Sequence, residues 1–127
     1  MRQNFRTGGF EDVGAYSRAV RVGNQIVVSA TAPTGDDGKA LHPGDTFAQT
    51  QVALERATAA VRELGGTVED VVRTRVYLSR DSDWREAIRA HAEIFTGIFP
   101  ANTTYYVEGF IPPGVLVEVE VDAIVDG

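Results

Sequence analysis

The chain has 127 residues, 43% of them hydrophobic and 24% charged, which fits a single globular domain over residues 1–127. Eighteen acidic residues against 12 basic ones give a formal net charge of -6, so the long-range field repels polyanions and argues against nucleic acid as a partner. Since the chain has no cysteine, only two histidines, no run of about 18 apolar residues and no signal peptide, we expect a soluble cytoplasmic protein without disulfides, a catalytic metal or a membrane contact.

The first elements predicted along the chain are a hairpin and a loop. Residues 17–22 and the β-branched run 25–31 flank Gly23-Asn24, a pair typical of the tight turn between antiparallel strands. Residues 33–45 are dense in glycine, proline and aspartate, a composition that no regular element tolerates. We therefore expect an antiparallel hairpin followed by a long loop.

The next predicted element is a helix. Apolar residues recur at helical spacing between Phe47 and Leu64. Thr46 and Gln49 have the spacing of a capping box, which predicts the start of the helix. The pair Gly65-Gly66 ends it, because glycine readily adopts the left-handed conformation found after a helix C-terminus.

A strand and a second helix are predicted in the middle of the chain. Residues 68–79 are rich in β-branched side chains and alternate as in a half-buried strand. One face of this strand carries Arg73, Arg75 and Tyr77, and the other carries Val72, Thr74, Val76 and Leu78. Asp83, with Glu86 three residues later, is typical of a helix N-cap. This helix ends at Gly97, and its apolar stripe consists of Trp84, Ile88, His91 and Phe95.

Two further strands complete the predicted order. Residues 103–109 and 115–124 both have strand patterns, and the second alternates regularly between two faces. The order is therefore ββαβαββ, an α/β (α+β) protein in which two helices back one face of a sheet. Because the other face has no cover within the chain, it must be polar, wet or closed by another subunit.

Charged side chains are expected on that uncovered face. Glu118, Glu120 and Asp122 share one face of their strand at spacings of about 7 Å, so they need cations or water beside them. Arg73 and Arg75 can compensate these charges if the two strands are neighbours. An ordinary salt-bridged surface accounts for Arg73, Glu120 and Asp122. Glu118 and Arg75, in mid-strand between apolar residues, are better placed for binding or proton transfer.

Of four other polar side chains, three have both a structural and a functional interpretation. His91 lies within the apolar stripe of its helix, so packing is the default interpretation. Tyr16 and Ser29 lie on neighbouring strands of the first hairpin, where such residues are usually structural. His42 lies among loop glycines and prolines and indicates no role. The sequence contains neither the Gly-x-Ser-x-Gly turn of a serine hydrolase nor a phosphate-binding loop.

Six segments of the chain form a recognisable set. The first is Gly14-Ala15-Tyr16-Ser17 within residues 13–20. Five others follow in order, namely Gly23-Asn24 with Val28-Ser29, residues 45–51, residues 70–77, Phe99-Pro100-Ala101, and residues 113–120. Together they span nearly the whole chain and resemble the Rid (reactive intermediate deaminase) or YjgF-like family, whose opening motif is Gly-Pro-Tyr-Ser.

The resemblance implies a fold, an assembly and an activity. Rid proteins have a six-stranded mixed sheet with two helices on one face, and they form chorismate-mutase-like homotrimers with a small-molecule pocket at each subunit interface. Members of the deaminase type hydrolyse 2-imino or enamine acids to 2-oxo acids and ammonia without a metal or cofactor. Their pocket uses a tyrosine, a serine and a glutamate that correspond to Tyr16, Ser29 and Glu118, together with an arginine in the motif Pro-Ala-Arg.

The chain departs from the family pattern at this arginine. Asn102 stands in its place, and the glycine and glutamine that commonly follow the serine are Ala30 and Thr31. Asparagine supplies neither the charge nor the two parallel donors that hold a carboxylate. We therefore expect Arg75 or Arg18 to replace the lost clamp, with Asn102, Ala30 and Thr31 as further substrate-binding positions.

Within the family, the chain more closely resembles an arginine-lacking branch marked by residues 16–21 and Arg89-Ala90-His91. Two functions follow from the resemblance. As an enzyme, the protein hydrolyses a C=N or enamine bond, with Glu118 as the base and Tyr16 or Ser29 as hydrogen-bond donors. The alternative is a non-catalytic homotrimer that binds a small metabolite or a partner protein. The acidic charge disfavours the endoribonuclease activity attributed to some family members.

Overall fold

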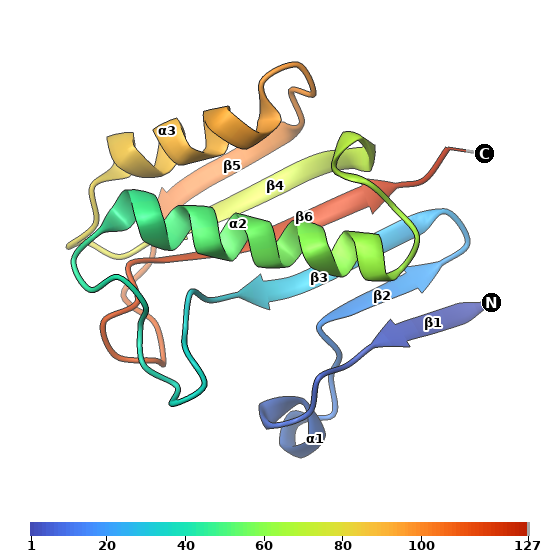
Figure 1. Ribbon diagram of the computed structural model, residues 1–127, viewed down its shortest axis with the longest axis horizontal. Coiled ribbons are helices and arrows are strands. Elements are labelled where there is room, and N and C mark those ends of the chain that lie inside the picture. Colours follow the sequence, from blue (N-terminus) through green and yellow to red (C-terminus); the bar gives the residue numbers. More distant parts are fainter. Residues whose placement is uncertain (127) are drawn as a thin grey trace.

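One mixed sheet and two long helices make up the fold (Figure 1). The computed structural model describes residues 1–126. In chain order the elements are β1 (Arg2–Phe5), α1 (Phe10–Gly14), β2 (Ala19–Val22), β3 (Gln25–Thr31), α2 (Thr46–Glu63), the 3-10 turn η1 (Val68–Asp70), β4 (Val71–Leu78), α3 (Trp84–Phe95), β5 (Ala101–Tyr106) and β6 (Val117–Ile124). The strand order is β1-β2-β3-β6-β4-β5, with β4 and β5 parallel and the other neighbours antiparallel. The predicted six-stranded mixed sheet is confirmed.

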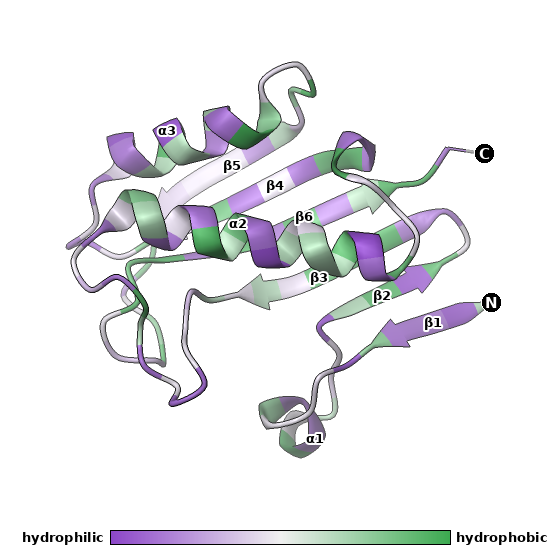
Figure 2. Ribbon diagram, in the orientation of Figure 1, coloured by the Kyte–Doolittle hydropathy of each residue, from purple (hydrophilic) through white to green (hydrophobic). Residues whose placement is uncertain are grey.

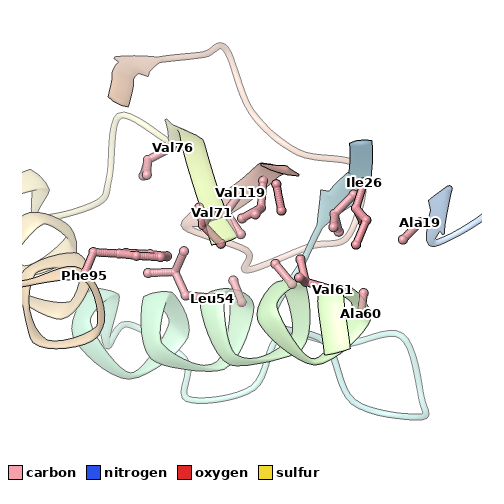
Figure 3. Packing of buried hydrophobic residues seen from close by; sticks show 14 of the residues in the cluster. Ala19, Ile26, Leu54, Ala60, Val61, Val71, Val76, Phe95 and Val119 are labelled. Atoms are coloured by element: carbon pink, nitrogen blue, oxygen red, sulfur yellow. The ribbon is translucent and has the colours of Figure 1, made fainter. Parts of the chain in front are cut away.

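Helices α2 and α3 lie on the same face of the sheet, as predicted (Figure 1). Figure 3 shows Leu54 and Val61 of α2 directed toward the sheet, where Ile26 and Val119 belong to the same hydrophobic cluster. All four side chains are fully buried. The core therefore lies between the helices and one side of the sheet, and the other side has no helix over it.

The strand β1 and the short helix α1 are absent from the predicted order ββαβαββ, which is wrong at its beginning. β1 has only four residues and pairs with β2 alone, at the edge of the sheet. Figure 2 shows it as predominantly hydrophilic. An edge strand that buries almost no side chain needs no alternation of apolar and polar residues. The sequence of β1 therefore has no strand pattern and cannot be told from a polar chain end.

The central strand β6 has the predicted alternation. It lies between β3 and β4, and its residues Val117, Val119 and Val121 are fully buried against the helices. Glu118 and Glu120 alternate with these valines, so they point to the uncovered face. The strand starts two residues later than predicted from the run 115–124.

The strand β4 differs from its prediction at its first residues. Residues Val68–Asp70 form a 3-10 turn, which is closed by reciprocal hydrogen bonds between Thr67 and Asp70. A shift in the pairing of β4 with β6 at Val72 then leaves that side chain 42% exposed instead of facing the core. A bulge of this kind adds one residue to a strand and therefore breaks its two-residue period locally.

The start of α2 also corrects the capping-box prediction. Asp45 is the N-cap, and its carboxylate accepts a hydrogen bond from Ala48 N at 3.0 Å. Gln49 is fully buried, and its Oε1 accepts a hydrogen bond from Leu116 N at 2.8 Å. Thr46 accepts from the backbone N of Asp83, the confirmed N-cap of α3, at 3.0 Å. The two helix starts are thus tied together.

Candidate functional site

The uncovered face carries the charged side chains that the strand patterns predict. Arg75 Nη1 donates a hydrogen bond to Asp122 Oδ2 at 3.1 Å, and the hydroxyl of Tyr77 donates one to the carboxylate of Glu120. The hydrogen bond to Asp122 raises the pKa of Arg75 above its ordinary value. Arg75 and Tyr77 thus have acidic partners on β6, and the Nη1 atom of Arg75 is already engaged by Asp122.

Glu118 differs from the other acidic residues of β6 because it has no such partner. Within residues 1–126 its carboxylate makes no hydrogen bond or ion pair, although the side chain is half-buried opposite Tyr77. Burial raises the pKa of the Glu118 carboxyl above its ordinary value, while the charge of Arg18 opposes this rise and that of Glu120 adds to it. Of the acids on this face, Glu118 is therefore the best suited to accept a proton.

A hollow opens at the β1–β3 side of the uncovered face. Its volume is about 550 Å³, and it is lined by Arg2, Asn4, Arg6, Asp12, Ala15, Tyr16, Ser17, Val20 and Ser29. Tyr16 is 41% exposed here and offers its phenol. Ser29 donates its only hydroxyl hydrogen to the backbone oxygen of Ser17 at 2.6 Å, so toward a ligand it is an acceptor.

Arg18 lies beside Tyr16 of the hollow, and its charge reaches Glu118, although neither Arg18 nor Glu118 lines the hollow itself. Its guanidinium carbon lies 5.7 Å from the centre of the Tyr16 ring, and its Nη1 donates to the backbone oxygen of Ala30 at 3.2 Å. Its charge acts on the Glu118 carboxyl. Of the two arginines predicted to hold a substrate, Arg18 is thus the one beside Tyr16, whereas Arg75 lies on β4, two strands away from β3.

The local backbone explains how Tyr16 and Ser29 reach this position. Ala15 ends α1 in the left-handed conformation, with φ 59°, and so turns the chain into Tyr16. The pairing of β3 with β6 shifts register between Val28 and Thr31, so that Ser29 lies in a bulge. Bulges bend a strand and redirect its side chains, which is why they are frequent beside binding sites.

Glu11 is a site residue that sequence reasoning missed. It is only 3% exposed, and its carboxylate accepts from Thr7 N at 2.9 Å and Thr7 Oγ1 at 2.7 Å and pairs with Arg18 Nε at 3.3 Å. Burial alone would raise its pKa, but the hydrogen bonds from Thr7 and the charge of Arg18 hold the pKa of Glu11 below its ordinary value. It belongs to the five-residue α1, too short for a periodicity argument to find.

Asn102 does not lie with Glu118, contrary to the expectation from the family motif. It pairs in register with Thr74, a fully buried residue of the helix-covered face, and its Nδ2 donates to Thr74 Oγ1 at 3.0 Å. Strand alternation gives the uncovered face to the next residue, Thr103, whose hydroxyl accepts from Arg73 Nη1 at 3.4 Å. The asparagine that stands in place of the family arginine therefore has its side chain on the helix-covered face, opposite to the face that carries Glu118.

The two residues after Ser29 contribute unequally to the site. Ala30 supplies its backbone oxygen to Arg18. Thr31 is buried, and its hydroxyl donates to the backbone oxygen of Ser29 at 2.8 Å. Thr31 thus supports the bulge, and its hydroxyl hydrogen is already engaged.

His91 has a polar partner that the sequence pattern does not reveal. Its Nε2 lies 2.8 Å from Thr74 Oγ1, and its ring centre lies 4.7 Å from that of Phe95. Burial lowers the pKa of His91 below its ordinary value. A chain of hydrogen bonds therefore runs from Asn102 through Thr74 to His91, between the sheet and α3.

Metal and membrane features are also absent from the described chain. Among residues 1–126, no three His, Asp or Glu side chains are grouped so that they could hold a metal ion. No helix in the same range combines the length and apolarity needed to cross a membrane.

Comparison with known proteins agrees with the fold and covers almost the entire chain. A family model described as endoribonuclease L-PSP matches residues 9–125. An uncharacterized protein of Streptomyces coelicolor is 40% identical over 115 residues, which are 90% of this chain and 84% of that protein. A RutC family protein of Pyrococcus abyssi is 32% identical over 108 residues, 85% of this chain and 84% of that protein.

Solved structures support the same grouping. Rv2704 of Mycobacterium tuberculosis, described as a member of the YjgF/YER057c/UK114 family, superposes with a TM-score of 0.87 at 42% identity, covering 98% of this chain and 100% of that one. The YjgF protein of E. coli superposes with a TM-score of 0.78 at 27% identity, covering 95% and 93%. Fold and site define a small α+β domain with a polar site on the uncovered face of a mixed sheet. The chain belongs to the YjgF, or Rid, family.

Proposed function

We propose that the site around Glu118 hydrolyses the C=N bond of a small imine or enamine, without a metal or cofactor. The observation that carries this proposal is the half-buried carboxylate of Glu118, which has no partner within residues 1–126 and lies in the field of Arg18, itself beside Tyr16. Such a site offers a base, a cation and a hydrogen-bond donor to one small polar molecule.

In the proposed reaction, Glu118 accepts a proton from water while the water oxygen attacks the imine carbon. The proton then passes to the nitrogen and gives a carbinolamine. Transfer of the carbinolamine hydroxyl proton to the same nitrogen, again through Glu118, lets the C–N bond break with its electron pair on nitrogen, so that a carbonyl compound and ammonia leave. Tyr16 donates a hydrogen bond to the reacting group. Ser29 accepts one from the substrate N–H, because its own hydrogen is engaged by Ser17. The overall reaction consumes only water.

We further propose that a homotrimer closes the uncovered face and completes the pocket between subunits. Apolar side chains on this face are substantially exposed in the single chain, with Val27 at 40%, Tyr105 at 54% and Ile124 at 52%. Exposed apolar groups of this size favour burial against another surface. The assembly implied by the family resemblance agrees with this requirement.

A second candidate is a homotrimer that binds a small metabolite or a partner protein without catalysis. The observation that favours it is the position of Asn102, which leaves β5 without a cation on the uncovered face. RNA cleavage is a weaker proposal, because Glu118, Glu120 and Asp122 share this face and the net charge is -6.

Turnover of simple imines separates the two candidates. We expect the protein to accelerate conversion of 2-iminopropionate and 2-iminobutyrate, formed in situ by an amino acid oxidase, to the 2-oxo acids and ammonia. Rates equal to those in buffer, together with binding of 2-oxo acids at the site, would favour the binding protein instead.

A further inference from the structure

The contacts of Arg18 leave one edge of its guanidinium available. Nε pairs with the buried carboxylate of Glu11 at 3.3 Å, and Nη1 donates to the backbone oxygen of Ala30 at 3.2 Å. Within residues 1–126 no partner is found for Nη2. Only a quarter of the Arg18 side chain is exposed, at 25%. The group is therefore held in place while still able to meet a ligand.

We propose that Glu11 is a positioning residue that presents the free edge of Arg18 to the carboxylate of a small monoanionic ligand. This inference rests on the proposed function, because it concerns the same site. Arg18 takes over the anchoring role of the arginine that this chain lacks at the family position. Glu11 contributes to ligand binding by holding Arg18 in place.

Glu11 is itself held rigidly enough to position another group. Thr7 donates to its carboxylate from both the backbone N, at 2.9 Å, and the hydroxyl, at 2.7 Å. The backbone oxygen of Glu11 accepts from Tyr16 N at 3.1 Å. Glu11 thus holds the guanidinium of Arg18 with its carboxylate and the backbone of Tyr16 with its own backbone oxygen. Fixing an arginine before binding removes much of the side-chain entropy that a ligand must otherwise overcome.

The ion pair with Glu11 also keeps Arg18 from neutralising the proposed base. Arg18 is close enough to lower the pKa of Glu118, yet its only ion pair in residues 1–126 is with Glu11. A salt bridge to Glu118 would occupy both the base and the anchor. Because the contacts with Glu11 and Ala30 use Nε and Nη1, a ligand carboxylate can accept from Nη2 without displacing either partner.

The charge of the ligand follows from the other groups at the hollow. Arg6 Nη2 is paired with Asp12 Oδ1 at 2.6 Å, so these two charges cancel, and Arg2, which also lines the hollow, adds a positive charge that favours an anion. A ligand with one carboxylate and a polar reacting group matches the remaining donors, and the hollow of about 550 Å³ suits a small molecule.

The test compares a charged probe with a neutral one. Pyruvate and methyl pyruvate differ at the carboxylate, and their binding to the whole protein can be followed by NMR titration. For Glu11→Gln we expect affinity for pyruvate to fall about tenfold, since a charge-assisted contact is misaligned, and affinity for methyl pyruvate to change less than about twofold. Glu63→Gln, the same change at an exposed site near the end of α2, should alter neither affinity.

Each outcome bears on a different claim. Wild-type protein that binds neither probe would contradict both the proposed function and this inference. Wild-type binding of pyruvate with equal binding by Glu11→Gln would overturn the inference alone, as would an equal loss of both probes, which indicates a purely structural role. Should Glu11→Gln fail to fold, Glu11→Asp keeps the charge and shortens the side chain, and the same selective loss of pyruvate binding is expected. An unchanged ratio of the two affinities in Glu11→Asp would contradict the proposal.

Discussion

Three acidic residues follow one another on the same face of β6, yet their surroundings differ. Asp122 and Glu120 have partners in Arg75 and Tyr77, whereas Glu118 has none in the part of the chain that the structure describes. Its mid-strand position and the family resemblance made Glu118 a candidate in the sequence, and the structure gives a physical basis for that choice in its burial and its raised pKa. The same reasoning favoured Arg75, but a cross-strand partner cannot be identified until the strand order is known.

Asn102 provides a sharp test of how β5 faces the site. We predict that Asn102→Arg leaves imine turnover within about twofold of wild type and costs about 1 kcal/mol of stability, because the side chain lies on the helix-covered side and now donates to Thr74. Steady-state rates and thermal melts measure both effects.

The matched variant is Thr103→Arg, one residue further along β5. Its guanidinium would lie on the uncovered face beside Arg73. We expect this change to alter turnover of carboxylate-bearing imines by more than Asn102→Arg does. The reverse ranking would contradict the assignment of the two side chains to opposite faces.

At the scale of elements, sequence patterns located the helices and strands that bury apolar surface and missed the short elements that bury little. The helices and β6 were predicted because their periodicity reflects burial against one core. β1 and α1 were missed since they are short and polar, and the hollow and Glu11 depend on both of them. Tyr16, Ser29 and Glu118 could be named from a resemblance, but the sequence did not indicate that Arg18 lies beside Tyr16 or that Asn102 faces away.

The contact between α3 and β4 has a predictable pH dependence. Burial lowers the folded-state pKa of His91, so the unfolded chain takes up its proton first as the pH falls below the ordinary value of 6.5. The free energy of unfolding should therefore decrease from pH 7 to pH 5 through this residue. His91→Phe removes that contribution, and we expect it to cost about 1 kcal/mol at pH 7 through loss of the Thr74 hydrogen bond.

Chemical denaturation at both pH values measures this effect. The stability difference between wild type and His91→Phe should shrink or reverse at pH 5, while imine turnover at pH 7 persists. A constant difference would show that His91 is not buried as a neutral group, and a loss of turnover in a folded variant would give His91 a role beyond packing.

For the whole molecule, the uncovered sheet face determines the expected assembly. A mixed sheet with helices on one side must bury the other side or keep it polar, and this face combines ion pairs with exposed valine, isoleucine and tyrosine. We predict a sedimentation mass three times the 13.7 kDa of one chain. A mass equal to one chain would contradict the interface site, since the hollow and Glu118 would then stay open to water.

The rate ratio between wild type and Glu118→Gln tests the central claim most directly. Glutamine keeps the shape of the side chain and removes the base, so folding and oligomeric mass should be retained. With 2-iminopropionate at pH 7 we predict a fall in turnover of at least about 100-fold, the usual contribution of a positioned general base. Turnover within a few fold of wild type in the folded variant would show that Glu118 does not activate water.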